Sequence, residues 1–217
     1  MSLAPREISS LPSLVARAEA LLAAQPGERV IIGIVGCPGS GKSALAEALA
    51  RTIPGAAWVP MDGYHLADAE LVRLGRRERK GAIDTFDAHG YLALLRRIRT
   101  ETSTIVYAPE FDRRIEQPVA GAIPVLPETR VIITEGNYLL DDAEPWPEVR
   151  EALDEVWFRD VADVVRQERL IARHVQFGKA PDFAREWVAT VDEPNAQRII
   201  AGAAHADVLV NDLDLHR

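Results

Sequence analysis

One octapeptide, Gly-Cys-Pro-Gly-Ser-Gly-Lys-Ser at residues 36–43, constrains the fold of this chain more than any other feature. It matches the phosphate-binding loop pattern G-x-x-x-x-G-K-[ST] at every fixed position. The apolar, β-branched run at residues 30–35 is typical of a buried parallel strand, and strong helix formers follow at residues 44–50. This order of strand, loop and helix places backbone N–H groups and a helix N-terminus around phosphate oxygens. The pattern therefore predicts binding of a nucleoside triphosphate.

The residues of the loop divide the task of holding a nucleotide. Glycines let the backbone approach phosphate oxygens closely, the lysine reaches the β and γ phosphates, and the serine hydroxyl ligates Mg²⁺. A glycine-rich turn without a ligand is the alternative, and both flanking segments argue against it. The expected cofactors are ATP and Mg²⁺. The cofactor-binding set comprises Gly36, Cys37, Pro38, Gly39, Ser40, Gly41, Lys42, Ser43 and Ala44.

Composition argues against several other classes of protein. A formal net charge of −8 is unusual for a nucleic-acid-binding surface. The single cysteine, Cys37, excludes an internal disulfide and suits a reducing compartment. No apolar stretch approaches the ~20 residues of a membrane span, and the start has no signal-peptide pattern. We therefore expect a cytoplasmic protein with a small-molecule substrate and no nucleic-acid or membrane partner, and we leave a homodimer open.

Strands and helices alternate along the 217 residues, which indicates a single α/β domain. A first helix is expected within residues 8–26, with Ser9 or Ser10 as its cap, and another from about residue 89 to 99. Residues 62–130 would form a substrate-side insertion that ends in short strands and turns, and residues 161–180 a lid helix. Buried-type strands are expected at residues 30–35, 56–61, 131–134, 155–158 and 208–210.

Two carboxylates follow strands of this expected sheet. Asp62 comes directly after the second strand and Glu135 after the third. Ligands of parallel sheets collect at the carboxyl ends of strands, so both side chains would face the γ-phosphate if both strands flank the strand that carries the loop. Phosphoryl transfer needs a metal ligand and a group that accepts the proton of the acceptor hydroxyl. Acidic residues before glycine also serve as turn formers or helix caps, and each carboxylate alone fits either role.

Other polar residues have weaker signals. Asp84 is a candidate acceptor of hydrogen bonds from substrate hydroxyls, whereas Asp87 precedes a helix and is more simply an N-cap. The basic residues between positions 66 and 84 are best interpreted as a solvated face. Phe111 lies near a proline, a setting that fits packing as well as a pocket wall.

Three arginines share one face of the expected lid helix, because Arg166, Arg169 and Arg173 fall at i, i+3 and i+7. One interpretation is an amphipathic helix with a solvated side. The favoured one is a lid that closes over the triphosphate and supplies guanidinium groups, because no acidic residue interrupts the row at the contact positions. The opposite face, which would anchor the helix, consists of Val161, Val164, Ile171 and Val175.

In their order and spacing, these motifs resemble the phosphoribulokinase, uridine kinase and pantothenate kinase family of P-loop kinases. They span about residues 30–175, and the succession MDG, KGxxDTFD, EGNYLL is far more specific than the loop alone. The chain looks most like bacterial nucleoside/nucleotide kinase-like proteins labelled fructose transport system kinase. The matching stretches are GCPGSGKS (36–43), MDGYH (61–65), KGAIDTFD (80–87), YAPEFDR (107–113), VIITEGNYLL (131–140) and RQERLIARH (166–174).

The resemblance implies a P-loop NTPase three-layer sandwich: a mainly parallel five-stranded sheet in the order 2-3-1-4-5, helices on both faces and a helical lid. It implies that Asp62 is the catalytic base, that Ser43 and Glu135 serve Mg²⁺, and that Asp84 contacts substrate hydroxyls. The implied catalytic residues are Asp62, Lys42, Arg166, Arg169 and Arg173. The candidates for substrate binding are Asp62, Tyr64, His65, Asp84, Phe111, Arg113 and Asn137.

The chain departs from two named members of that family. Uridine kinases carry a tyrosine and then a histidine where this chain has Phe111 and then Arg113-Arg114, and the Tyr-Ser-His pattern of pantothenate kinases is absent from the sequence. We therefore expect an ATP- and Mg²⁺-dependent kinase for a hydroxyl of a small polar metabolite, such as a sugar, a nucleoside or a pantothenate-like acid. The alternatives are a nucleotide-hydrolysing switch coupled to a protein partner and a binding module without turnover.

Overall fold

A fully parallel sheet of six strands forms the middle layer of the protein, whose structure is a computed structural model that describes residues 5–211 and 213. Every pair of neighbouring strands in it runs parallel. In spatial order the strands are β1 (Arg6–Ile8), β8 (Val208–Val210), β7 (Glu155–Arg159), β2 (Val30–Val35), β6 (Val131–Gly136) and β3 (Ala56–Pro60).

The five expected strands are all present, and their expected order is confirmed as β3-β6-β2-β7-β8. The sixth strand, β1, extends the sheet by pairing with β8, and the sequence expectation missed it. Its three residues are too few to show a periodic pattern. The condition that the second and third strands both flank the loop-bearing strand is not met, in agreement with the expected order. Only β6 pairs with β2, and β3 lies one strand further out.

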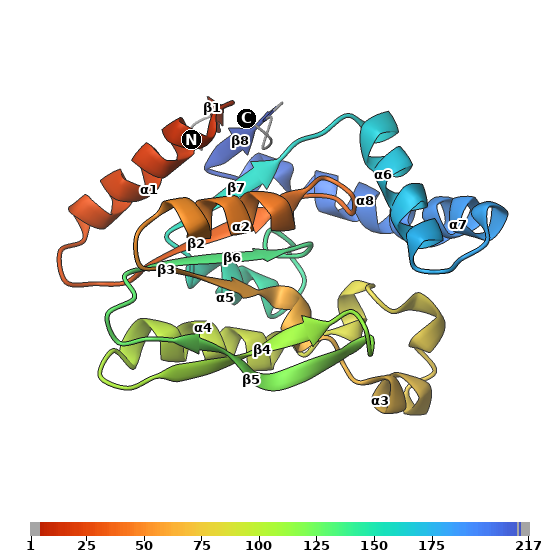
Figure 1. Ribbon diagram of the computed structural model, residues 1–217, viewed down its shortest axis with the longest axis horizontal. Helices are drawn as coiled ribbons and strands as arrows, with labels where there is room; N and C mark the ends of the chain where they lie inside the picture. The colour runs from red at the N-terminus through yellow and green to blue at the C-terminus, as the bar shows by residue number, and fades with distance from the viewer. Residues whose placement is uncertain (1–4, 212, 214–217) are drawn as a thin grey trace.

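Helices cover both faces of the sheet (Figure 1). On one face pack α1 (Leu11–Ala24) and α2 (Lys42–Thr52), which bury leucines against alternate residues of β2. The Ser10 hydroxyl accepts a hydrogen bond from the backbone N–H of Ser13, so the expected capping of α1 is confirmed at Ser10.

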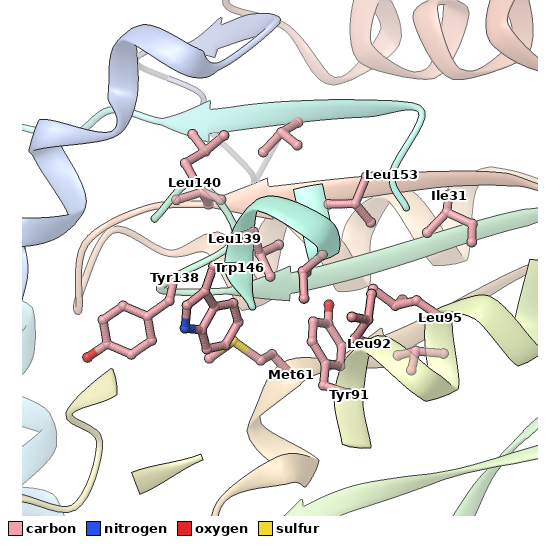
Figure 2. Packing of buried hydrophobic residues seen from close by; sticks show 14 of the residues in the cluster. Ile31, Met61, Tyr91, Leu92, Leu95, Tyr138, Leu139, Leu140, Trp146 and Leu153 are labelled. Carbon is pink, nitrogen blue, oxygen red and sulfur yellow. The ribbon is translucent and has the colours of Figure 1, made fainter. Parts of the chain in front are cut away.

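The opposite face of the sheet carries α4 (Ala88–Thr100) and α5 (Trp146–Glu151). Tyr91, Leu92 and Leu95 of α4 gather there with Trp146 and Leu153 (Figure 2). Asp87 caps α4 by accepting a hydrogen bond from the backbone N–H of Gly90, which confirms its expected role. Because α4 belongs to this core layer, residues 62–130 do not form a single separate insertion.

The segment after β3 and the first two helices after β7 lie beyond the carboxyl ends of the strands, where β6 and β7 point in Figure 1, and the hairpin after α4 runs alongside that helix. After β3 come short helical turns and one short helix: η1 (Met61–Tyr64), α3 (Asp68–Arg73), η2 (Arg77–Arg79) and η3 (Ile83–Thr85). An antiparallel hairpin follows α4 and consists of β4 (Val106–Asp112) and β5 (Gln117–Val125).

The C-terminal part contributes α6 (Asp163–Gln176), α7 (Pro181–Trp187), the π-helical turn η4 (Val188–Asp192), α8 (Glu193–Ala201) and η5 (Ala203–His205). The expected lid helix is therefore followed directly by two more helices that pack with it. Among the described residues, none of the helices has the length and apolar character needed to cross a membrane.

Candidate active site

The phosphate-binding loop connects β2 to α2 at the carboxyl end of the sheet. Gly39 and Gly41 both have φ of 81°, a conformation that residues with side chains rarely adopt. A Cβ atom at Gly39 would also lie 2.4 Å from the carbonyl oxygen of Arg166, so α6 packs directly on the loop. No side chain caps α2, which leaves the N–H groups of its first turn available to a phosphate. The loop therefore fits a nucleotide triphosphate.

Behind the loop, a serine and a buried carboxylate form a pair that fits Mg²⁺. The Ser43 hydroxyl donates a hydrogen bond of 3.1 Å to Oε1 of Glu135, which lies at the carboxyl end of β6. Glu135 is 2% exposed, and its Oε2 atom has no hydrogen-bond partner. Burial raises the pKa of this carboxyl to about 7, although the nearby Lys42 ammonium opposes the shift. Carboxylate and hydroxyl oxygens are ligands that Mg²⁺ accepts, and an oxygen without a hydrogen-bond partner has a lone pair left for a cation.

Asp62 reaches the same place from β3, although β6 separates that strand from β2. It lies in η1 directly after β3, and its carboxylate is 3.4 Å from the Arg113 guanidinium. Asp62, Ser43 and Glu135 line one cavity of about 470 Å³, with the hairpin β4–β5 as its outer wall. The structure thus brings together the two carboxylates that the sequence placed at strand ends.

A second cavity of about 430 Å³ shares Ser43, Asp62, Phe111 and Arg113 with the first. It extends from Pro38 and Lys42 towards the C-terminal helices. His65 stands in its wall between two aromatic rings, 4.0 Å from the Phe86 centroid and 4.8 Å from the Phe111 centroid. Burial lowers the pKa of His65, and its Nδ1 atom donates to the carbonyl of Asp62. Asn137 also lines this cavity, and its side-chain oxygen is buried without a partner.

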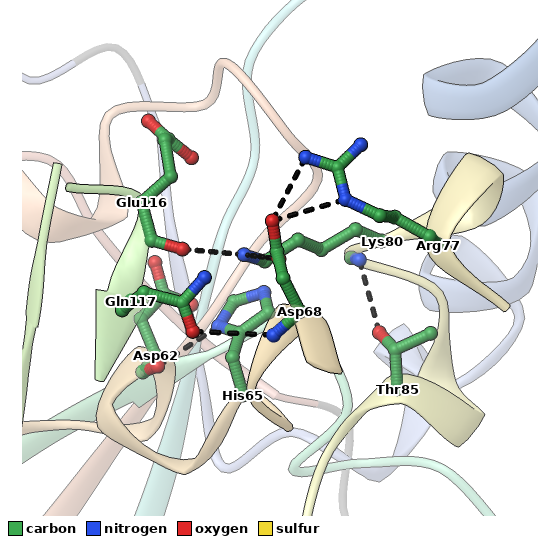
Figure 3. A network of polar contacts seen from close by, with 9 residues as sticks. Asp62, His65, Asp68, Arg77, Lys80, Thr85, Glu116 and Gln117 are labelled. Atoms are coloured by element: carbon green, nitrogen blue, oxygen red, sulfur yellow. Dashed lines mark hydrogen bonds and ion pairs between the residues drawn. The ribbon is translucent and has the colours of Figure 1, made fainter. Parts of the chain in front are cut away.

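Part of the basic segment 66–84 also faces this second cavity. Figure 3 shows Asp68 between Arg77 and Lys80, and it accepts hydrogen bonds of 3.0 Å and 2.6 Å from them. Lys80 also donates to the carbonyl oxygen of Glu116 at the tip of the hairpin. The interpretation as a solvated face is therefore incomplete, because Arg77 and Lys80 line the cavity.

Several sequence candidates lie elsewhere. Asp84 is paired with Arg76 at 3.4 Å and Arg79 at 2.6 Å, and it lines neither cavity. Tyr64 packs on the Tyr91 ring in the core, 5.5 Å between centroids. The thiol of Cys37 is buried, and burial raises its pKa to about 11. Within the loop, Ser40 is buried, and the side of α2 that carries Ala44 is exposed.

The three arginines of α6 do not act as a set. Arg166 is 1% exposed and pairs with Asp163 at 2.7 Å and with Glu193 of α8 at 2.6 Å, and it does not line the small cavity beside the loop. Arg169 and Arg173 line a small cavity of about 190 Å³ together with Gly39, Gly41, Lys42 and Ser43. Of the three arginines expected to face the phosphate loop, only Arg169 and Arg173 line the cavity beside it.

The expected valine face of α6 is wrong. Val164 is 66% exposed and Val175 is exposed as well, while the buried residues of α6 are Arg166 and Leu170. The reason is that α6 packs on the glycine loop through Leu170, whose side chain would be 2.9 Å from a Cβ at Gly39. The cavity walls supplied by α7 and η4, such as Trp187 and Asp192, were missed because helical periodicity does not indicate which side of a helix meets a distant loop.

Comparison with known proteins places this site in a family, although no family model matches the chain. "Putative uridine kinase C227.14" of Schizosaccharomyces pombe is 37% identical over 187 residues, which cover 79% of this chain and 77% of that protein. The chain belongs to the uridine kinase-like P-loop kinases. "ATP-dependent kinase-like protein notR'" of Aspergillus versicolor is 39% identical over 149 residues, covering 64% of this chain and 87% of that protein.

A solved structure supports the same assignment. The crystal structure of a "putative fructose transport system kinase" from Silicibacter sp. TM1040 matches with a TM-score of 0.82 and 35% identity, covering 90% of this chain and 98% of that one. The family and fold class that the motifs predicted are thus confirmed, and the protein is a small-molecule kinase.

Proposed function

We propose that this kinase uses ATP and Mg²⁺ to phosphorylate a hydroxyl group of a small polar metabolite. One observation carries the proposal: Asp62 lines the same cavity as Ser43 and Glu135. A carboxylate that faces both a metal-binding pair and the phosphate loop has the position that a proton acceptor needs in phosphoryl transfer.

In this proposal, the loop and the N-terminus of α2 hold the triphosphate, and Lys42 follows the γ-phosphate into the transition state. Ser43 and Glu135 would hold Mg²⁺, which neutralises charge on the phosphates when it is bound. Asp62 accepts the proton of the acceptor hydroxyl, and the Arg113 guanidinium orients its carboxylate. Phosphoryl transfer requires little else than this positioning and charge stabilisation.

The C-terminal helices complete the proposed site. Arg169 and Arg173 lie beside Gly41 and Lys42, where their guanidinium groups can approach the γ-phosphate. Arg166 is assigned no contact with phosphate, because it pairs with Asp163 and Glu193 and does not line the cavity beside Gly41 and Lys42. Closure of these helices over the substrates would exclude water from the reaction.

The test compares two carboxylate variants. Asp62→Asn keeps the size of the side chain but loses its basicity, so transfer should slow by about 10²-fold or more while ATP·Mg²⁺ binding persists. Glu135→Gln should lose Mg²⁺ affinity as well as rate. Nucleotide binding titrated against Mg²⁺ and ADP release with a panel of alcohols measure both effects. Asp182→Asn, at an exposed position of α7, is the matched control.

Two outcomes would contradict the proposal. If Asp62→Asn loses ATP·Mg²⁺ binding as severely as Glu135→Gln, Asp62 belongs to the metal site and is not the base. If ADP is released at the same rate with and without every alcohol of the panel, the protein hydrolyses its nucleotide and acts as a switch.

A further inference from the structure

Lysine is scarce in this sequence, and every lysine of the chain lines the second cavity. The chain has three lysines and 22 arginines. All three lysines, Lys42, Lys80 and Lys179, line the second cavity, although they come from α2, from the loop after η2 and from the loop before α7. Lysine offers a compact ammonium with three donors, whereas arginine offers a rigid planar fork, so the two are not equivalent in a binding site.

The cavity is positively charged within an acidic protein. Six of its lining residues are lysine or arginine and four are acidic, whereas the whole chain has a net charge of −8. The acids do not neutralise this excess, because Asp68 is shared between Arg77 and Lys80. Asp192 in turn receives a hydrogen bond of 2.9 Å from His174. Net positive charge within a walled cavity attracts an anionic ligand.

Lys179 stands out among these cations. Its ammonium lies 3.7 Å from the centroid of the Trp187 ring and 5.7 Å from that of Phe183, so two aromatic faces hold it in place. Within residues 5–211 it makes no ion pair with a carboxylate. Burial lowers the pKa of this ammonium, with Asp192 opposing the shift. A cation that aromatic rings hold in place, with no carboxylate of the described residues at ion-pair distance, can bind an anion.

The nucleotide does not account for this end of the cavity. Lys42 belongs to the phosphate loop, and Arg169 and Arg173 line the small cavity against Gly39 and Gly41. Lys80 and Lys179 lie outside that small cavity, and both stand over aromatic rings, Lys80 at 5.2 Å from the Phe111 centroid. Among the described residues, Lys179 therefore remains as an ammonium without an ion pair on the side of the cavity where the acceptor would bind, and Lys80, which already pairs with Asp68, is a second cation there.

We propose that the acceptor alcohol carries a second group that is anionic, a carboxylate or a phosphate, which Lys179 and Lys80 bind. This inference rests on the proposed function and makes it narrower. The hydroxyl would approach Asp62, and the anionic group would extend towards Trp187. A neutral sugar or nucleoside would leave the partly buried Lys179 ammonium with its aromatic contacts but without an anion in the cavity to pair with.

Matched pairs of acceptors test the inference by kinetics. We would compare ribose with ribose 5-phosphate, glycerol with glycerate, and sorbitol with gluconate, measuring ATP-dependent formation of the phosphorylated product. Anionic members should have the higher kcat/KM, and the better pair tells whether the group is a phosphate or a carboxylate. A consistent preference for the neutral members would overturn the inference and leave the proposed function standing.

Variants of Lys179 test the residue itself. Lys179→Met should raise KM for the preferred anionic acceptor by about 10-fold or more, as expected for a lost hydrogen bond to a charged group. It should leave KM for ATP and for the neutral partner unchanged, and Lys179→Arg should recover most of the loss because it keeps the charge. Arg185→Met removes one charge from an exposed position of α7 and is the matched control. An equal rise of KM for both members of a pair would overturn the role of Lys179.

A labelling experiment does not depend on turnover. Pyridoxal 5′-phosphate forms an imine with a lysine amine, and borohydride fixes it, so mass spectrometry can locate the modified lysine. With ATP and Mg²⁺ present, Lys179 and Lys80 should react at least about 10-fold faster with pyridoxal 5′-phosphate than with neutral pyridoxal. Equal rates would overturn the anion site. Anion-selective labelling in a protein that phosphorylates no alcohol would instead contradict the proposed function and keep the anion site.

Discussion

The Glu135 carboxyl binds a proton more readily in the folded protein than in the unfolded chain, because the site buries it. It is buried at the end of β6 with one oxygen unpartnered, and burial raises its pKa from 4.5 to about 7. Between these two values the folded protein binds a proton that the unfolded chain has already released. Folding stability therefore falls as the pH rises through this interval, because the folded state must then ionise a buried group.

Glu135→Gln should remove this component of the pH dependence. Without nucleotide or metal, the thermal midpoint of the variant should gain on that of the parent as the pH rises from 4.5 to 7, and the difference should level off above that pH. One unit of pKa shift corresponds to about 1.4 kcal/mol, so the difference should be a few kcal/mol at most. Thermal unfolding of both proteins across this range measures it, with Glu151→Gln on the surface as control. Parallel curves for parent and variant would show that Glu135 ionises normally.

At the scale of an element, α6 combines two roles that its sequence did not separate. Arg166 joins α6 to α8 through Glu193, and its carbonyl packs on Gly39. Arg169 and Arg173 instead face the loop. The spacing of the arginines predicted one common face, but it contained no information about Glu193, which lies 27 residues further along the chain. The contact with Glu193 therefore decides that Arg166, and not Arg169 or Arg173, forms a structural ion pair.

Variants of the three arginines should therefore divide into two classes. Arg166→Ala removes a side chain that is 1% exposed and leaves Asp163 and Glu193 without their shared partner, so the thermal midpoint should fall by several degrees. Arg169→Ala and Arg173→Ala should lower turnover by at least about 10-fold with little change in thermal midpoint, because exposed arginines contribute little to folding. Thermal unfolding and steady-state kinetics of all three variants provide the measurement. Full activity in both Arg169→Ala and Arg173→Ala would show that these arginines only form the solvated side of an amphipathic helix.

At the scale of the whole molecule, the order of the strands could be predicted from the sequence, but the walls of the cavities could not. The positions and order of five of the six sheet strands were predictable because the loop motif and the succession MDG, KGxxDTFD, EGNYLL place the chain within a known arrangement, whereas the three-residue β1 was missed. The cavity walls were not predictable, since Lys80, Lys179 and Trp187 meet only after the sheet, the segment after β3 and the C-terminal helices have assembled. Asp84 is a second example. Its motif predicted contact with substrate hydroxyls, but its carboxylate forms ion pairs with Arg76 and Arg79, which no spacing rule indicates.

A buried arginine holds together the opposite end of the molecule from the site. Arg29 directly precedes β2 and is 1% exposed. Its guanidinium donates hydrogen bonds to the carbonyl oxygens of Thr129 at 3.0 Å, Ile98 at 2.7 Å and Leu126 at 2.8 Å. These contacts connect the start of the loop-bearing strand to the end of α4 and to the turn between β5 and β6. Burial lowers the pKa of Arg29, so the carbonyls must supply what water would otherwise provide.

Arg29→Met should therefore destabilise the fold and leave the chemistry intact. Removing the donors leaves several buried carbonyl oxygens unpaired, and each unsatisfied group costs about 1–3 kcal/mol. The total should be about 3 kcal/mol or more, which for a domain of this size lowers the thermal midpoint by about 6–12 °C. Kinetic constants measured well below the midpoint should stay within about twofold of the parent, because Arg29 lines neither site cavity. Arg51→Met, at an exposed position of α2, controls for loss of an arginine. If Arg29→Met melts within about 2 °C of the parent, water or a rearranged loop satisfies these carbonyls, and packing alone holds these three segments together.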